Sequence, residues 1–85
     1  MSTFPTAEQV RQYILDGLAC QHVEVVGDDG QHFEAVIVSQ EFAGKRAVAR
    51  HQMVYKALGD RMHSEIHALS MRTLTPEEWE AEGGR

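Results

Sequence analysis

A helical segment separates the second and third of only three extended segments, and this order leaves few folds open. In residues 47–63 apolar side chains recur at the i, i+4, i+8 spacing of an amphipathic helix, at Val54, Leu58 and Met62. Further apolar residues lie near the same side, namely Val48, Met53 and Ala57. Gly59 weakens this helix locally but need not end it. Because three strands cannot shelter helix layers on both faces, we expect an α+β fold with a three-stranded sheet and helices packed mainly on one face.

The extended segments are marked by β-branched residues and by turn residues between them. Residues 22–27, HVEVVG, alternate and end at a Gly-Asp-Asp-Gly turn, after which residues 32–39, HFEAVIVS, follow at once. This pair is typical of a β-hairpin. The unbroken Ala-Val-Ile-Val run predicts that the second strand is central and covered on both faces at that end. Residues 65–74, EIHALSMRTL, form the third expected strand.

Two capping boxes predict where the first and last helices begin. Thr6 and Gln9 have the spacing at which each side chain binds the backbone amide of the other, and Thr75 and Glu78 repeat it, with Pro76 at the first helical position. The first helix carries an apolar stripe formed by Val10, Ile14 and Leu18. We expect this helix to end within residues 17–20. The element order is therefore α-β-β-α-β-α.

The chain is short enough to be one domain, residues 1–85, in which residues 76–85 form the last helix and a frayed tail. Its single cysteine, Cys20, excludes an internal disulfide, a self-contained zinc site and a four-cysteine iron–sulfur site. No run reaches the roughly 18 apolar residues of a membrane-spanning helix, and the N-terminus lacks the pattern of a signal peptide. We expect a cytoplasmic protein.

The charge of the chain is unevenly distributed. The net charge of −5 argues against a generic nucleic-acid binder, because phosphate backbones attract basic proteins. Residues 41–61 nevertheless contain five basic and two acidic residues, a local charge of +3. Solvent-facing cations on an amphipathic helix are one explanation of this excess, and a surface for an anionic partner is the other.

Five histidines in 85 residues justify a search for a metal site. His67 lies in the middle of the third strand, where the alternative to a metal ligand is a half-buried imidazole bonded to the backbone. His32 opens the second strand just after the turn, where the alternative is an ordinary surface histidine. His22 and Cys20 flank the end of the first helix, and we interpret both as structural residues.

The sequence contains no motif that predicts catalysis. It has no G-x-x-x-x-G-K-S/T, G-x-G-x-x-G or H-E-x-x-H pattern, and its serines lack an arrangement that predicts a base and an oxyanion hole. The carboxylate pairs Asp28–Asp29 and Glu77–Glu78 fall in an expected turn and an expected helix cap. A core this small leaves little room for a substrate pocket. We therefore expect a protein that is not an enzyme.

Two stretches carry a family resemblance. Residues 42–58, FAGKRAVARHQMVYKAL, contain a phenylalanine–glycine turn that leads into R-H-x-x-V-Y-x-x-L. Residues 66–79, IHALSMRTLTPEEW, contain an I-H-A strand and a T-P-E-x-W ending. With these motifs the sequence resembles the BolA family, and within it the short bacterial IbaG-type branch, from the first helix to Trp79. The resemblance implies a fold like the class II KH domain.

The resemblance also implies a cofactor and a partner. In BolA proteins the histidine of the H-A strand is the ligand-type residue, here His67. It would be one protein ligand of a [2Fe–2S] cluster shared with a monothiol glutaredoxin, whose cysteine and bound glutathione supply the thiolates. The second family ligand comes from the loop between the first two strands, where His32 is the only candidate. The implied function is iron–sulfur cluster trafficking or iron and redox regulation, by a protein that alone is a monomer or a weak homodimer.

DNA binding is the alternative function. BolA proteins resemble nucleic-acid-binding modules, and some are described as transcriptional regulators in stress responses. The G-x-x-G motif with which KH domains clamp RNA is missing here. DNA would instead meet the basic helix over residues 45–61, through Lys45, Arg46, Arg50 and Lys56. The net charge of −5 predicts a modest affinity with a steep salt dependence.

Overall fold

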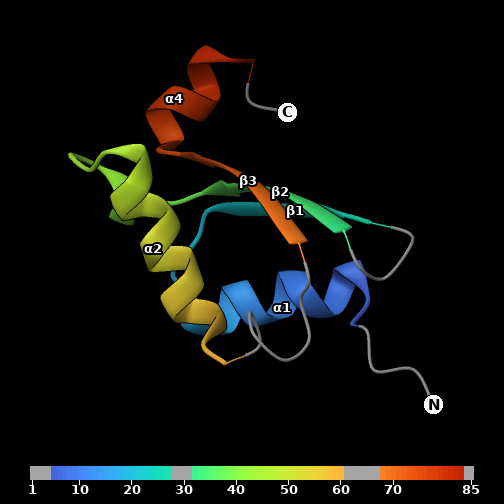
Figure 1. The fold of residues 1–85 in the computed structure, drawn as a ribbon. Coiled ribbons are helices and arrows are strands. Elements are labelled where there is room, and N and C mark those ends of the chain that lie inside the picture. The colour runs from blue at the N-terminus through green and yellow to red at the C-terminus, as the bar shows by residue number, and fades with distance from the viewer. Residues whose placement is uncertain (1–4, 28–31, 61–67, 84–85) are drawn as a thin grey trace.

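The computed structural model describes residues 5–27, 32–60 and 68–83 (Figure 1). Its elements, labelled as in Figure 1, are α1 (Ala7–Gly17), β1 (His22–Val26), β2 (His32–Val38), the 3₁₀ helix η1 (Gln40–Phe42), α2 (Ala47–Leu58), β3 (Ala68–Leu74) and α4 (Pro76–Ala81). Apart from the short η1, this is the expected order of helices and strands. Residues 65–67 of the expected third strand lie outside the described residues.

The sheet is mixed, with β2 between β1 and β3. β1 pairs antiparallel with β2, as the hairpin prediction requires, and β3 pairs parallel with β2. A parallel pair needs a crossover connection, and the segment with η1 and α2 provides one. Ile37 and Val38 point to opposite faces of β2 and are 0% and 1% exposed. The prediction of a central strand covered on both faces at this end is therefore confirmed.

The core lies between the sheet and the two longer helices, which cover the same face of the sheet (Figure 1). α1 contributes Val10 and Ile14, and α2 contributes Val54 and Leu58, all fully buried. The strands and η1 supply the rest of the buried cluster, namely Val23, Phe33, Ala35, Ile37 and Phe42. The expected α+β architecture, with helices mainly on one face, is confirmed.

Both predicted capping boxes are present. The Thr6 hydroxyl accepts a hydrogen bond from the Gln9 N–H at 3.1 Å, and the Gln9 side-chain oxygen accepts one from the Thr6 N–H at 2.8 Å. Thr75 and Glu78 make the same two bonds at the start of α4, at 3.2 and 2.9 Å. These bonds satisfy amides that the first helical turn leaves without intrahelical partners, so both helices begin where the sequence predicts.

The end of α2 differs from the prediction. Gly59 is the C-cap, with a φ of 62°, and its N–H donates to the Tyr55 carbonyl oxygen at 2.9 Å. This left-handed region costs glycine little because it has no Cβ. The expectation that the helix continues through Gly59 is therefore wrong. Met62, the last member of the predicted stripe, lies outside the described residues.

Val48 was expected on the core side of α2, and this expectation is also wrong. Its side chain is 70% exposed. At 3.6 residues per turn, Val48 is rotated by roughly 120° around the helix axis from Val54. The core face is centred on Val54 and Leu58, so the first turn of the helix presents Val48 to solvent.

The connection from β2 to α2 is more tightly anchored than its polar composition predicts. Ser39 is fully buried, and its hydroxyl donates to the Ala19 carbonyl oxygen at 2.6 Å and accepts from the Glu41 N–H at 3.1 Å. Phe42, at the end of η1, is fully buried in the core. The hydrogen bonds of Ser39 and the burial of Phe42 thus hold the connection in place before α2 begins.

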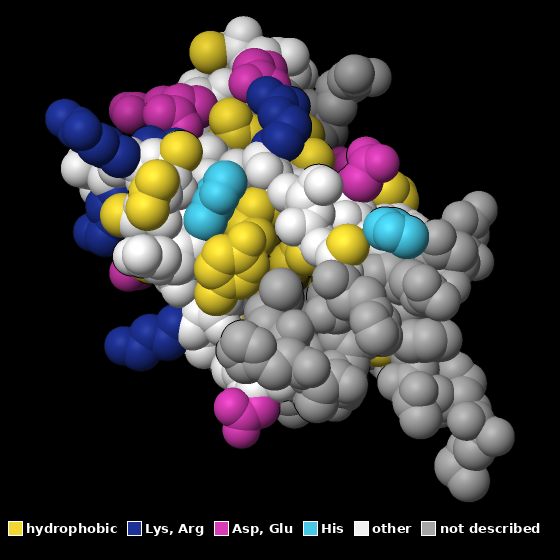
Figure 2. Space-filling model, in the orientation of Figure 1, with side chains coloured by type: hydrophobic (Ala, Val, Ile, Leu, Met, Phe, Trp, Pro, Cys, Tyr) yellow, Lys and Arg dark blue, Asp and Glu magenta, His cyan; other side chains and the backbone are white. Residues whose placement is uncertain are grey.

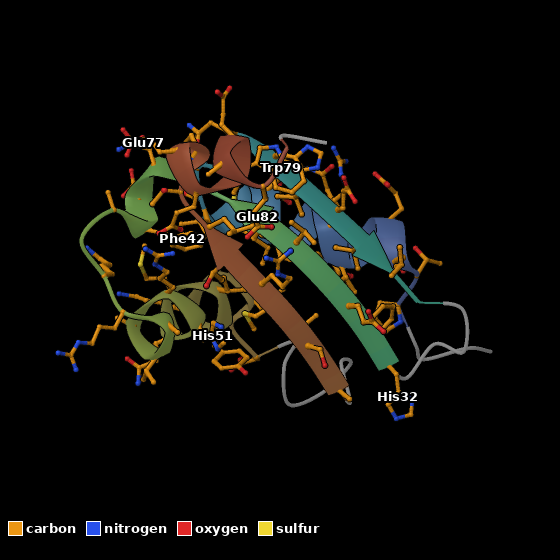
Figure 3. The ribbon with its side chains drawn as sticks, turned by 90° about the horizontal axis from the view of Figure 1, so that it is seen from above. His32, Phe42, His51, Glu77, Trp79 and Glu82 are labelled. Atoms are coloured by element: carbon orange, nitrogen blue, oxygen red, sulfur yellow. The ribbon has the colours of Figure 1, made fainter. Side chains whose placement is uncertain are left out.

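α4 lies on the opposite side of the sheet from α1 and covers only one end of it (Figures 1 and 3). Its Trp79 ring stacks on the imidazole of His22 in β1, with ring centroids 5.0 Å apart and an interplanar angle of 22°. The remainder of this face carries no helix of the described chain. Among the described residues, no helix has the length and apolar character needed to cross a membrane.

Candidate functional site

His32 is the first residue of β2, and its side chain is exposed at the end of the sheet far from α4 (Figure 3). Gly27 helps to define this place. A Cβ at Gly27 would lie 2.6 Å from the His32 carbonyl oxygen and 2.7 Å from Cδ1 of the buried Phe33. The chain after β1 therefore passes close to the start of β2, where only glycine leaves enough space.

The other expected ligand, His67, lies outside the described residues. Its chain neighbour Ala68 is the first residue of β3, and in the parallel register Ala68 is the partner of His32. Adjacent strands are roughly 4.8 Å apart. The structure thus brings the beginnings of β2 and β3 together, although their sequences are separated by the whole of α2.

Cys20 is poorly suited to join a metal site. Burial raises the pKa of its thiol to about 11, and Sγ donates to the Leu18 carbonyl oxygen at 3.3 Å. A thiol that stays protonated is a weak ligand, because metals bind the thiolate. Cys20 also precedes His22, which pairs with Val38 at the far end of β2. The seven residues from His32 to Val38 span about 20 Å of strand.

No group of three or more His, Cys, Asp or Glu side chains in metal-binding proximity occurs within residues 5–27, 32–60 and 68–83. The imidazole of His32 is one group at this end of the sheet that can donate a nitrogen to a metal.

The predicted basic surface is only partly available. Lys45, Arg46 and Lys56 are exposed, and Arg46 is the N-cap of α2 with no capping hydrogen bond from its side chain. Figure 2 shows Lys and Arg side chains gathered on the side of the molecule where α2 lies. These exposed cations can meet an anionic partner.

Arg50, the fourth predicted cation, is tied into the fold. Its guanidinium donates to the Thr73 carbonyl oxygen at 3.0 Å and to both Glu78 carboxylate oxygens, at 2.7 and 3.2 Å. Nε donates to the Lys45 carbonyl oxygen at 2.8 Å, and the side chain is only 12% exposed. Arg50 thus joins α2 to β3 and α4, and few of its donors remain for phosphate.

Sequence reasoning missed the contact that seats α4 on the sheet. His22 stacks on Trp79, and its Nε2 lies 2.6 Å from Oε2 of Glu24. The interpretation of His22 as a structural residue agrees with this packing. Nothing in the sequence pairs His22 with Trp79, because the two residues lie on elements far apart in the chain. The alternation of β1 could only have indicated that His22 and Glu24 share a face.

Comparison with known proteins gives a consistent result. The family model for BolA-like proteins matches residues 16–78. Protein BOLA2 of Arabidopsis thaliana is 44% identical over 78 residues, which cover 87% of this chain and 83% of that protein. The acid stress protein IbaG of Escherichia coli K12 is 35% identical over 72 residues, 84% of each chain. The DNA-binding transcriptional regulator BolA of Haemophilus influenzae is 47% identical over 51 residues, 60% of this chain and only half of that relative's length.

Solved structures agree with this assignment. A BolA homologue from Coxiella burnetii has a TM-score of 0.77 and 45% identity, and the match covers 89% of this chain and 97% of that one. A Bol-like protein from Babesia bovis has a TM-score of 0.82 and 36% identity, with 95% of each chain covered. These relatives are named as regulators, stress proteins or BolA proteins. Given its fold, its motifs and a family match over most of its length, the chain belongs to the BolA-like family.

Proposed function

We propose that this chain is a non-enzymatic partner of a monothiol glutaredoxin and shares a [2Fe–2S] cluster with it through histidine ligation. His67 is the first protein ligand and His32 the second. The role is iron–sulfur cluster trafficking or iron and redox regulation in the cytoplasm. Membership of the BolA-like family supports this function, because it makes the histidine of the I-H-A motif the candidate ligand.

One observation carries the proposal. His32 is exposed at the start of β2, and its register partner is Ala68, the residue directly after His67 in the chain. An imidazole at this end of the sheet is accessible to another molecule. The protein therefore contributes nitrogen ligands at one end, while the glutaredoxin cysteine and glutathione contribute thiolates.

The chemistry of the available donors favours histidine over cysteine. The Cys20 thiol is kept protonated by burial, with a pKa raised to about 11, and lies at the other end of β2. Histidine ligation of one iron raises the reduction potential of such a cluster relative to ligation by thiolates alone. A change of ligand between the two proteins would thus alter the stability and potential of the cluster.

Reconstitution with a monothiol glutaredoxin tests the proposal. The two proteins are mixed with glutathione, iron and sulfide, and visible absorption and circular dichroism are compared with those of glutaredoxin alone. We expect a new spectrum that is lost in His67→Ala and altered in His32→Ala. His51→Ala is the matched control, because His51 lies on α2, away from the His32 end of the sheet (Figure 3).

The same experiment can refute the assignment. If the holo-complex of His67→Ala keeps the wild-type spectrum, the histidine is not a ligand. If only His32→Ala is without effect, the cluster has a single protein ligand from this chain. Sizing chromatography of the apo mixture shows separately whether the two proteins associate without the cluster.

A second candidate function is DNA-binding regulation. It is favoured by the exposed Lys45, Arg46 and Lys56, and by the name of the Haemophilus influenzae relative. Removing one phosphate-binding cation should make the slope of log K against log salt shallower by about 1. We expect Lys45→Gln with Arg46→Gln to reduce the steepness of that slope by about 2 if DNA binds there. Absent or salt-independent binding of the unmutated protein to duplex DNA would remove this candidate.

A further inference from the structure

On the part of the sheet face that α4 leaves uncovered, acidic and aliphatic side chains alternate. Side chains that point away from α1 and α2 alternate along each strand. In the register of β1 and β2, Glu24 lies beside Val36, and Val26 lies beside Glu34. The two carboxylates and the two valines therefore form a checkerboard. On β3 the neighbours of Glu34 and Val36 are Ser70 and Arg72.

This face is hollowed as well as uncovered. A cavity of about 190 Å³ is lined by residues of all three strands, including Val26, Glu34 and Ser70. A second cavity of about 370 Å³ extends beneath α4 to Trp79 and Glu82. Both cavities are lined by Glu24, Val36 and Arg72, so they form one groove. In Figure 3 the sheet is seen from this side, with Trp79 and Glu82 at the end of the groove under α4.

The groove is lined by aliphatic and acidic side chains in alternation. Val26 is 60% exposed and lies beside Glu34 in the register of β1 and β2. Among the described residues that line the groove, the only cation is Arg72, whose Nη2 binds both carboxylate oxygens of Glu82 at 2.6 and 2.7 Å. That pair is neutral overall. The other carboxylates of the groove are Glu34 and Glu24, and Oε2 of Glu24 lies 2.6 Å from Nε2 of His22.

We propose that this groove is a docking site for a basic, amphipathic segment of a partner protein. Aliphatic side chains of the segment would contact Val26 and Val36, while its Lys or Arg side chains would meet Glu24 and Glu34. Charge complementarity selects this occupant. An acidic segment would be repelled by Glu24 and Glu34, and a purely apolar one would bury the Glu34 carboxylate without a cation. Glu34 lies two residues after His32 on the same face of β2, so the groove comes close to the His32 end of the sheet. The proposal does not rest on the glutaredoxin partnership.

A peptide of alternating lysine and valine tests the proposal with the full-length protein. Binding is followed by anisotropy of a fluorescein label and by the fluorescence of Trp79, the only tryptophan of the chain and part of the groove wall. We expect Glu24→Gln with Glu34→Gln to weaken binding by about tenfold, since each exposed ion pair contributes modestly. Val26→Ala should also weaken binding, because it removes apolar surface that the peptide would cover.

Control variants distinguish binding in the groove from general attraction between opposite charges. Asp16→Asn with Glu41→Gln removes the same amount of negative charge from exposed positions on α1 and η1. This variant should bind the lysine–valine peptide as the wild type does, and a glutamate–valine peptide should not bind. Equal weakening in both double variants, binding of the acidic peptide, or no binding by the wild type would each overturn the proposal.

Discussion

Gly17 is the residue at which α1 and α2 approach each other. A Cβ there would lie 2.7 Å from the Ala57 carbonyl oxygen and 2.8 Å from Ala57 Cα and Cβ. We expect Gly17→Ala to lower the free energy of unfolding by about 1–2 kcal/mol, because this clash outweighs the gain in helix propensity. Urea denaturation measures the change. Adding Ala57→Gly should recover part of the stability by removing the Cβ–Cβ clash, and an unchanged midpoint in Gly17→Ala would contradict the clash.

α4 is too short to be stable by itself, and Glu78 is one of the residues that hold it. The hydrogen bond from Arg50, followed by that from the Thr75 N–H, lowers the pKa of Glu78 from 4.5 to about 2. Because the folded pKa lies below the unfolded one, this stabilisation is present above about pH 4.5 and is lost as the pH falls toward 2. Urea denaturation from pH 6 to pH 2 should therefore show a stability difference between wild type and Glu78→Gln that shrinks with acidification. A constant difference would contradict this origin, and Glu77→Gln is the control from the same helical turn.

At the scale of the whole molecule, local signals in the sequence predicted the fold, whereas contacts between elements distant in the chain are evident only from the structure. The capping boxes of Thr6 and Thr75 depend on residues three apart, so they were predicted correctly. The end of α2 was missed because the helical stripe continues past Gly59 in the sequence, whereas the backbone turns at that residue. Within the candidate site, the placement of His32 beside β3 and the engagement of Arg50 by Glu78 depend on tertiary contacts without a sequence pattern.

The parallel pairing of β2 with β3 also has a consequence for folding. β1 and β2 are neighbours in the sequence and can pair early, whereas β3 must wait until the chain that includes α2 has closed a long loop. His32 belongs to the early hairpin and Ala68 to the late strand. A molecule that binds across both strands would therefore recognise only chains that have finished folding. By mass action it would also protect them from unfolding and from proteolysis.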